Sequence, residues 1–115
     1  MNGTLEIKKS KFIYYKIEGT LSDFVSALNK IKSEHKKATH ICYAYSFSSP
    51  FEEKACDDGE PKGTAGTPIL SVIHKKAKSN VGIIVVRYFG GVKLGAGGLV
   101  RAYTSAASSA FKEEE

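Results

Sequence analysis

The sequence lacks any apolar run approaching the roughly 20 residues that a bilayer-spanning helix needs. It also lacks a charged segment followed by an apolar one at its start, because the opening MNGTLEIKKSKF is predominantly polar. A secretory signal would need both segments in that order. These absences exclude a membrane-spanning protein, and we expect a cytoplasmic location and no membrane partner.

Cysteine is scarce, with only Cys42 and Cys56 in the chain. In a reducing compartment we expect two such residues to be free thiols rather than a disulfide. We also expect both thiols to be buried. A zinc site would need further ligands, and only His35, His40 and His74 are available, at irregular spacing. The sequence therefore predicts no metal centre built on cysteine.

Arginine is also scarce: only two of the 17 basic residues are arginines, and the excess of lysine gives a formal charge of +5. Lysines cluster within residues 8–11, 30–37 and 75–78. Such a surface attracts polyanions without choosing among them. Each cluster, taken alone, is equally consistent with a solvated face.

The length of 115 residues, with 42% hydrophobic and 25% charged residues, is typical of one globular domain. The lysine-rich start predicts a flexible basic leader over residues 1–10. A single domain is expected over residues 11–112. The charged end predicts a disordered tail over residues 113–115.

Hydrophobic periodicity predicts alternating strands and helices within that domain. Thr20 and Asp23 form a capping pattern at the start of the first helix. Residues 51–56 fit either a short return strand or a loop, because the segment is charged. The order predicts a two-layer α/β (α+β) sandwich, with a mixed four-stranded sheet and the helices on one face. The expected strands are 11–17, 39–47 and 81–88, with 51–56 as either a further strand or a loop, and the expected helices are 21–37, 67–80 and 99–111.

A glycine-rich segment, RYFGGVKLGAGGLVRAY over residues 87–103, holds five of the eleven glycines. It matches neither common phosphate-binding fingerprint. Amide groups from about Gly95 to Leu99 open the last helix, and Lys93 and Arg101 lie within a turn or two, which together predict an anion pocket. The alternative is that these glycines only allow a helix and a strand to cross closely.

Residues 57–68, DDGEPKGTAGTP, contain too many helix and strand breakers for a regular element, so we expect a surface loop. Arg87 ends an apolar strand and needs a carboxylate partner, for which the candidates are Asp57, Asp58 and Glu60. The pair would be either an internal salt bridge that holds the loop or a metal-assisted phosphate site. The Asp-Asp-Gly run also fits a simple turn.

No nucleophile with a matched base emerges, since none of the three histidines has a sequence context that pairs it with one. No catalytic residue is assigned. Charge, the glycine-rich segment and tyrosines able to stack on bases favour a binding surface instead.

Four segments together, KSKF, ATHICYAY, DDGEPKGTAGTPIL and VVRYFGGVKLGAGGLVRAY, resemble the YigZ/Impact amino-terminal domain family over about residues 8–111. The resemblance implies a fold similar to the second domain of a small-subunit ribosomal protein. Eukaryotic Impact relatives look like regulators of translation, and bacterial YigZ relatives have no settled activity and are thought to bind nucleic acid. The resemblance implies a functional surface made of Asp57, Asp58, Gly59, Glu60, Pro61, Gly63, Thr64, Gly66, Arg87, Gly90, Gly91, Lys93, Gly95, Gly97, Gly98 and Arg101.

Three functions remain open from the sequence. The first is a non-enzymatic module that binds RNA, ribosomes or a translation-regulatory protein through the glycine-rich segment, without a cofactor. The second is an enzyme or sensor for a small phosphorylated ligand, with Mg²⁺ or a similar divalent metal at the acidic loop. The third is a protein-interaction domain in which the glycines are purely architectural.

Overall fold

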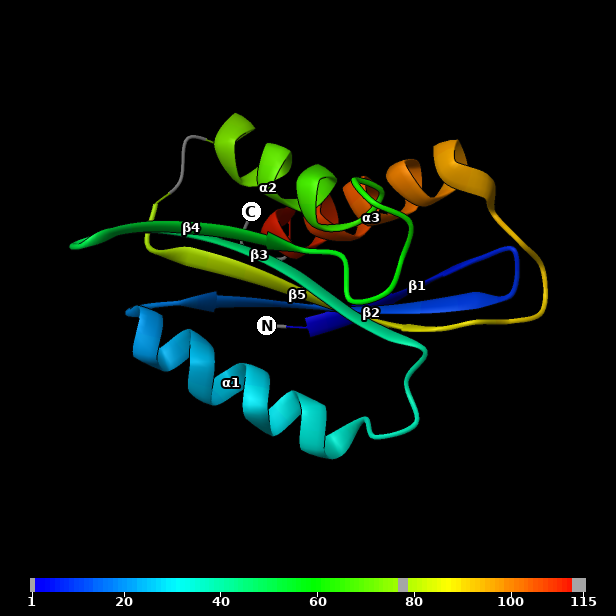
Figure 1. Ribbon diagram of the computed structural model, residues 1–115, viewed down its shortest axis with the longest axis horizontal. Helices are drawn as coiled ribbons and strands as arrows, with labels where there is room; N and C mark the ends of the chain where they lie inside the picture. The colour runs from blue at the N-terminus through cyan, green and yellow to red at the C-terminus, as the bar shows by residue number, and fades with distance from the viewer. Residues whose placement is uncertain (1, 77–78, 113–115) are drawn as a thin grey trace.

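The structure is a computed structural model that describes residues 2–76 and 79–112. These residues form five strands and three helices (Figure 1). Their bounds, in chain order, are β1 (Asn2–Ile7), β2 (Ser10–Glu18), α1 (Leu21–Glu34), β3 (His40–Ser48), β4 (Phe51–Cys56), α2 (Gly66–Lys75), β5 (Val81–Tyr88) and α3 (Gly95–Lys112).

The strands form one sheet in the order β1-β2-β5-β3-β4, and every neighbouring pair is antiparallel. The α+β class is confirmed, and so is the return strand over residues 51–56. The sheet differs from the prediction in two respects, since it has five strands rather than four and is wholly antiparallel rather than mixed. Strand β5 lies at its centre and places its carboxyl end, with Arg87, against both β2 and β3.

The additional strand is β1, which occupies most of the predicted basic leader. Residues 2–7 pair with β2 through a tight turn at Lys8 and Lys9, both of which have positive φ (47° and 69°). Leu5 and Ile7 pack against the core while Thr4 and Glu6 stay exposed. The predicted flexible leader is therefore wrong, because this short alternation supplies an amphipathic edge strand. Met1 and the predicted tail at 113–115 lie outside the described residues.

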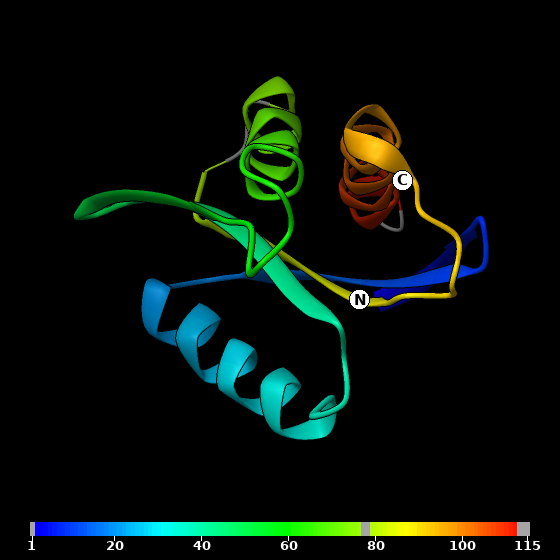
Figure 2. The same ribbon diagram turned by 45° about the vertical axis from the view of Figure 1, so that its right-hand side comes forward.

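The helices cover both faces of the sheet, which corrects the prediction of helices on one face. Figures 1 and 2 show α1 alone below the sheet, with α2 and α3 side by side above it. Alternate side chains of β3 serve the two layers: Tyr43 and Tyr45 pack with Phe24 of α1, whereas Cys42 and Ala44 pack with α2 and α3. Two covered faces explain why β3 and β5 are buried almost throughout.

The helix ends agree only in part with those expected from the sequence. The capping box of Thr20 and Asp23 is present, with reciprocal bonds of 3.1 and 2.9 Å. Helix α1 ends at Glu34 rather than near residue 37, and the ring nitrogens of the next residue, His35, bond two tyrosine hydroxyls. Helix α2 spans Gly66–Lys75, so it begins one residue before the expected start at 67 and ends before the expected end at 80. Within the described residues, no helix is long and apolar enough to cross a membrane.

Candidate functional site: a cavity beside the first turn of helix α3

The acidic loop between β4 and α2 is held together by Asp57. Its carboxylate accepts hydrogen bonds from the backbone amides of Gly63, Ala65 and Gly66 at 2.9, 3.1 and 2.9 Å. Burial alone would raise the pKa of Asp57, but the three amides outweigh it and hold the pKa below its ordinary value. Asp57 is therefore a structural anchor that shapes the loop from within.

The next residues form the turn that the sequence suggested. Asp58 and Gly59 both have positive φ (43° and 87°), and the Asp58 carboxylate accepts the amide of Ile41 at 2.6 Å. The carbonyl oxygen of Asp58 lies 2.8 Å from Nδ1 of His40, which must donate because a carbonyl only accepts. Thr64 donates its hydroxyl to the carbonyl of Pro61. The loop is thus tied to the start of β3.

Glu60 is the partner of Arg87 among the three carboxylates that the sequence proposed. Both oxygens of Glu60 accept from Nη1 of Arg87, at 2.7 and 3.0 Å, and both side chains are buried. The hydroxyl of Tyr103 donates to Glu60 at 2.5 Å, and Nε2 of His40 lies 3.4 Å from the same carboxylate. The internal salt bridge considered from the sequence is therefore present, and it joins the acidic loop to β5 and α3.

Arg87 is held on several sides by groups outside the acidic loop. Its Nη2 lies 3.2 Å from the hydroxyl of Ser10, and its guanidinium carbon lies 5.5 Å from the ring centres of both Phe12 and Phe89. Its Nε is buried and has no hydrogen-bond partner among residues 2–76 and 79–112. One donor of the guanidinium is therefore left unused next to the site.

Tyr103 is a buried member of this network that the sequence assigned only to helix packing. Its hydroxyl also lies 3.4 Å from the thiol of Cys42, and burial raises the pKa of both groups. Nothing in its helical spacing separates Tyr103 from an ordinary core residue. Its role depends on Glu60 and Cys42, which reach it from other segments.

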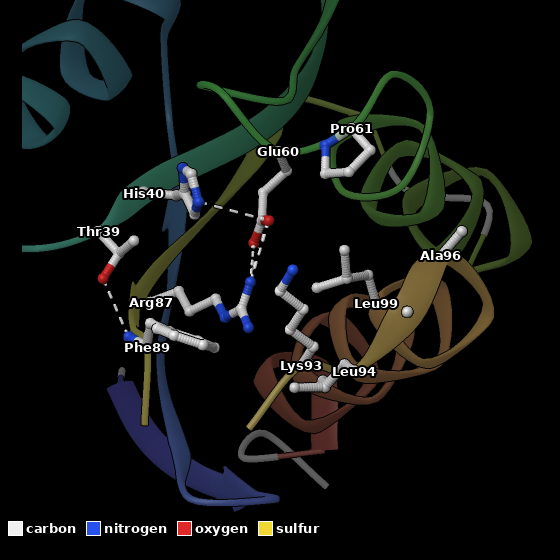
Figure 3. A pocket seen from close by; sticks show the side chains of 11 residues that line it. Thr39, His40, Glu60, Pro61, Arg87, Phe89, Lys93, Leu94, Ala96 and Leu99 are labelled. Atoms are coloured by element: carbon white, nitrogen blue, oxygen red, sulfur yellow. Dashed lines mark hydrogen bonds and ion pairs between the residues drawn. The ribbon is translucent and has the colours of Figure 1, made fainter. Parts of the chain in front are cut away.

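Beside this network lies a cavity of about 430 Å³. Figure 3 shows Arg87 and Lys93 both pointing toward its centre, with the first turn of α3 forming one wall. The walls combine a few polar groups with several apolar ones. The lining residues are Thr39, His40, Glu60, Pro61, Arg87, Phe89, Lys93, Leu94, Gly95, Ala96 and Leu99.

The first turn of α3 has almost no side chains and no side-chain cap among the described residues. Its opening residues are Gly95, Ala96, Gly97 and Gly98, and no side chain within the described ranges accepts a hydrogen bond from their amides. The first amides of a helix have no partner inside the helix and form its positive end. This wall of the cavity therefore presents donors to an anion.

Not all of the predicted anion-binding residues reach this cavity. Arg87, Lys93 and Gly95 line it, whereas Gly98 and Arg101 line a second hollow of about 140 Å³ together with Ile7 and Lys8. A Cβ atom on Gly90 would lie 1.9 Å from the carbonyl oxygen of Lys9, so Gly90 is required by a close backbone crossing. Gly91 takes φ = +92° in open space and serves the turn.

Phe89 and Thr39 are site residues that the sequence did not single out. The amide of Phe89 donates to the hydroxyl of Thr39 at 2.9 Å, which holds the strand end in place. Phe89 is 46% exposed although its ring lies beside the buried Arg87. The only signal in the sequence was the position of an aromatic residue directly before two glycines, Gly90 and Gly91.

The acidic loop does not fit a divalent cation. Its carboxylates already accept hydrogen bonds from the chain itself: Asp57 from three amides, Asp58 from Ile41, and Glu60 from Arg87 and Tyr103. No group of three or more histidine, cysteine, aspartate or glutamate side chains in the described part of the chain could hold a metal ion. The three carboxylates are thus already engaged by the chain itself.

The fold is that of a small α+β domain with a cavity between a buried ion pair and a helix start. Residues 8–111 match the Impact N-terminal domain, and the chain belongs to the Impact family. The sequence is 46% identical over 104 residues to the IMPACT family member YvyE of Bacillus subtilis. This match covers 89% of this chain and 48% of that protein. It is 37% identical over 112 residues to the IMPACT family member YigZ of Escherichia coli, covering 94% of this chain and 55% of that protein.

Two solved structures share the fold. A crystal structure of a hypothetical protein superposes with a TM-score of 0.87 at 32% identity, over 97% of this chain and 56% of that one. The two-domain translational regulator Yih1 superposes with a TM-score of 0.57 at 25% identity, over 95% of this chain and 45% of that one. The chain spans about half the length of the relatives it matches.

Proposed function

We propose that this domain is a non-enzymatic binding module that acts in the regulation of translation by attaching to RNA, on its own or within the ribosome. The observation that carries the proposal is the bare first turn of α3, which faces a cavity also lined by Lys93 and Arg87. Backbone donors and basic side chains at one place favour a phosphate group. The likeness to Yih1, a translational regulator, supports the biological context.

The distribution of charge around the cavity supports a polyanion rather than a single small anion. Arg101 and Lys8 line the smaller hollow, and Leu94 lines both this hollow and the larger cavity. Positive charge therefore continues from Lys93 along α3 to the turn between β1 and β2. A nucleic-acid backbone carries phosphates at regular intervals and can use both places.

The proposal is tested by removing charge from this surface. Replacing Lys93 and Arg101 together with alanine should weaken RNA binding and reduce the slope of log K against log salt by about 1.4, because about 0.7 is lost per single-strand phosphate contact. The matched control replaces Lys30 and Lys32, which are exposed on α1 across the sheet. A slope equal in both variants would contradict the proposal. Retention of a translation factor by the purified domain without RNA would point to a protein partner instead.

The size of the cavity favours a second candidate, a sensor or enzyme for a small phosphorylated ligand. A volume of about 430 Å³ accommodates a compact phosphorylated molecule. Calorimetry with nucleotides and sugar phosphates, each with and without magnesium, separates the candidates. Tight binding of a free small ligand would favour the second candidate, whereas heat only from RNA would favour the first.

A further inference from the structure

We propose that the cavity holds one nucleotide of single-stranded RNA, with the base inside the cavity and the phosphodiester at the first turn of α3. This inference rests on the proposed function and specifies the RNA that the domain selects. Four properties of the cavity carry it: its net charge, an unused donor of Arg87, its apolar walls, and the position of Phe89.

The charge of the cavity fits a group with one negative charge. Lys93 and Arg87 are the two cations that line it, and Glu60 is the one carboxylate. One net positive charge remains, and the positive end of α3 adds a fraction of a charge. A phosphodiester carries one negative charge, whereas a terminal phosphate carries nearly two at neutral pH. The balance therefore favours a phosphate within a strand over one at its end.

Arg87 provides evidence for a ligand that is independent of the helix start. The residue is 5% exposed and lines the cavity, yet its buried Nε has no hydrogen-bond partner in the part of the chain that the structure describes. An unsatisfied buried donor costs free energy and calls for an explanation. Because Nε itself is closed off from the cavity, a bound phosphate or base would compensate it through the charge of the guanidinium, which lines the cavity.

The remaining walls are suited to a flat, largely apolar ring. Leu94, Leu99, Pro61 and Phe89 line the cavity (Figure 3). Phe89 is 46% exposed, and its backbone amide is fixed by the bond to Thr39. Bases stack on exposed aromatic rings without strong sequence preference. Phe89 is therefore positioned to receive a base on its open side.

A base can enter such a cavity only when it is not paired and stacked in a helix. The inference therefore predicts selection of single-stranded over double-stranded RNA. A purely electrostatic surface would bind both, since it contacts phosphates alone. Strand preference thus separates this inference from the general proposal.

The test uses fluorescence anisotropy with a ten-nucleotide oligouridine and a ten-base-pair RNA duplex. Replacing the exposed Ala96 with phenylalanine should fill the mouth of the cavity without changing its charge. We expect about ten-fold weaker binding of the single strand by A96F. The matched control, Ser26→Phe on the exposed face of α1, should bind within two-fold of the original chain.

A second variant covers the case in which A96F fails to fold. Phe89→Ala removes the ring from an exposed position and should also weaken single-strand binding several-fold. The control is Val100→Ala, since Val100 is exposed on α3 and lines neither cavity. An oligonucleotide lacking its bases should bind the original chain as weakly as the normal strand binds F89A.

Several results would overturn the inference. One such result is equal affinity for the single strand and the duplex. Another is that A96F and F89A have no effect while K93A/R101A still weakens RNA binding. Either result would leave the RNA proposal standing but would show that no nucleotide occupies the cavity. If a peptide with a free carboxylate bound the original chain but not A96F, and RNA binding were unchanged, the cavity would be assigned to a peptide. No RNA binding by the original chain would remove both proposals.

Discussion

The guanidinium of Arg87 and the carboxylate of Glu60 lie 2.7 Å apart, although 27 residues separate them in the chain. Both side chains are almost fully excluded from solvent. A buried pair of this kind is costly to break, because removing one member leaves the other as an uncompensated charge. The pair therefore couples the acidic loop to the end of β5, at the floor of the cavity.

Replacing Arg87 with methionine should lower the free energy of unfolding by about 3–5 kcal/mol, since Glu60 would be left buried without its cation. The double variant Arg87→Met, Glu60→Leu should lose much less than the sum of the two single variants. Urea denaturation of all four proteins gives the coupling energy directly. Additive losses would show that the two groups do not depend on each other.

Asp57 should make the domain sensitive to acid. Its pKa is lower when folded than the ordinary value of 3.8, so its stabilising effect is complete above that value and is lost as the pH falls through the folded pKa. The variant Asp57→Asn should be less stable at neutral pH and should lose less further stability between about pH 4 and pH 2. Thermal unfolding across that range measures the difference. Parallel curves for the two proteins would refute the assignment.

Gly90 and Gly97 should respond oppositely to alanine. A Cβ atom at Gly90 would meet the backbone carbonyl of Lys9 at 1.9 Å, so Gly90→Ala must displace the turn between β1 and β2 and destabilise the fold. At Gly97 the nearest atom is the flexible end of Arg101 at 3.4 Å, and the position is helical. Gly97→Ala should therefore be neutral or stabilising by up to about 1 kcal/mol. Denaturation midpoints compare the two, and equal losses would contradict this account.

The two thiols should differ in reactivity. Cys42 is fully buried and burial raises the pKa of its thiol, whereas Cys56 is half-buried. Only the thiolate reacts, so a thiol reagent should label Cys56 first and Cys42 only when the domain unfolds. Labelling followed by peptide mass analysis identifies the order. Cys56→Ser is the control and should abolish the fast phase, and fast labelling that persists in it would contradict the burial of Cys42.

Elements whose cause is local were predicted well from the sequence. The capping box of α1 needs only Thr20 and Asp23, three residues apart, and it is present. The apolar run that Arg87 ends predicted a strand over residues 81–88, and β5 occupies those residues at the centre of the sheet. Strand β1 was missed because its alternation is short and lies beside lysines, and its burial depends on pairing with β2.

The candidate site was predictable in part for the same reason. Spacing along the chain placed Lys93 beside the start of α3 and identified three possible partners for Arg87. It could not choose Glu60 among them, and it could not show that Tyr103 completes the network. Those contacts depend on how β5, α3 and the acidic loop pack together.

The sequence by itself determined the approximate places of three strands and three helices, the glycine-rich start of the last helix and the excess of positive charge, since each follows from neighbouring residues. The tertiary structure alone decided which side of the sheet each helix covers and which carboxylate neutralises Arg87. It also decided that the unused donors of α3 open onto a cavity rather than onto the protein's own side chains. The physical reason is that burial and ion pairing act between segments that are distant in the chain, and only packing brings those segments together.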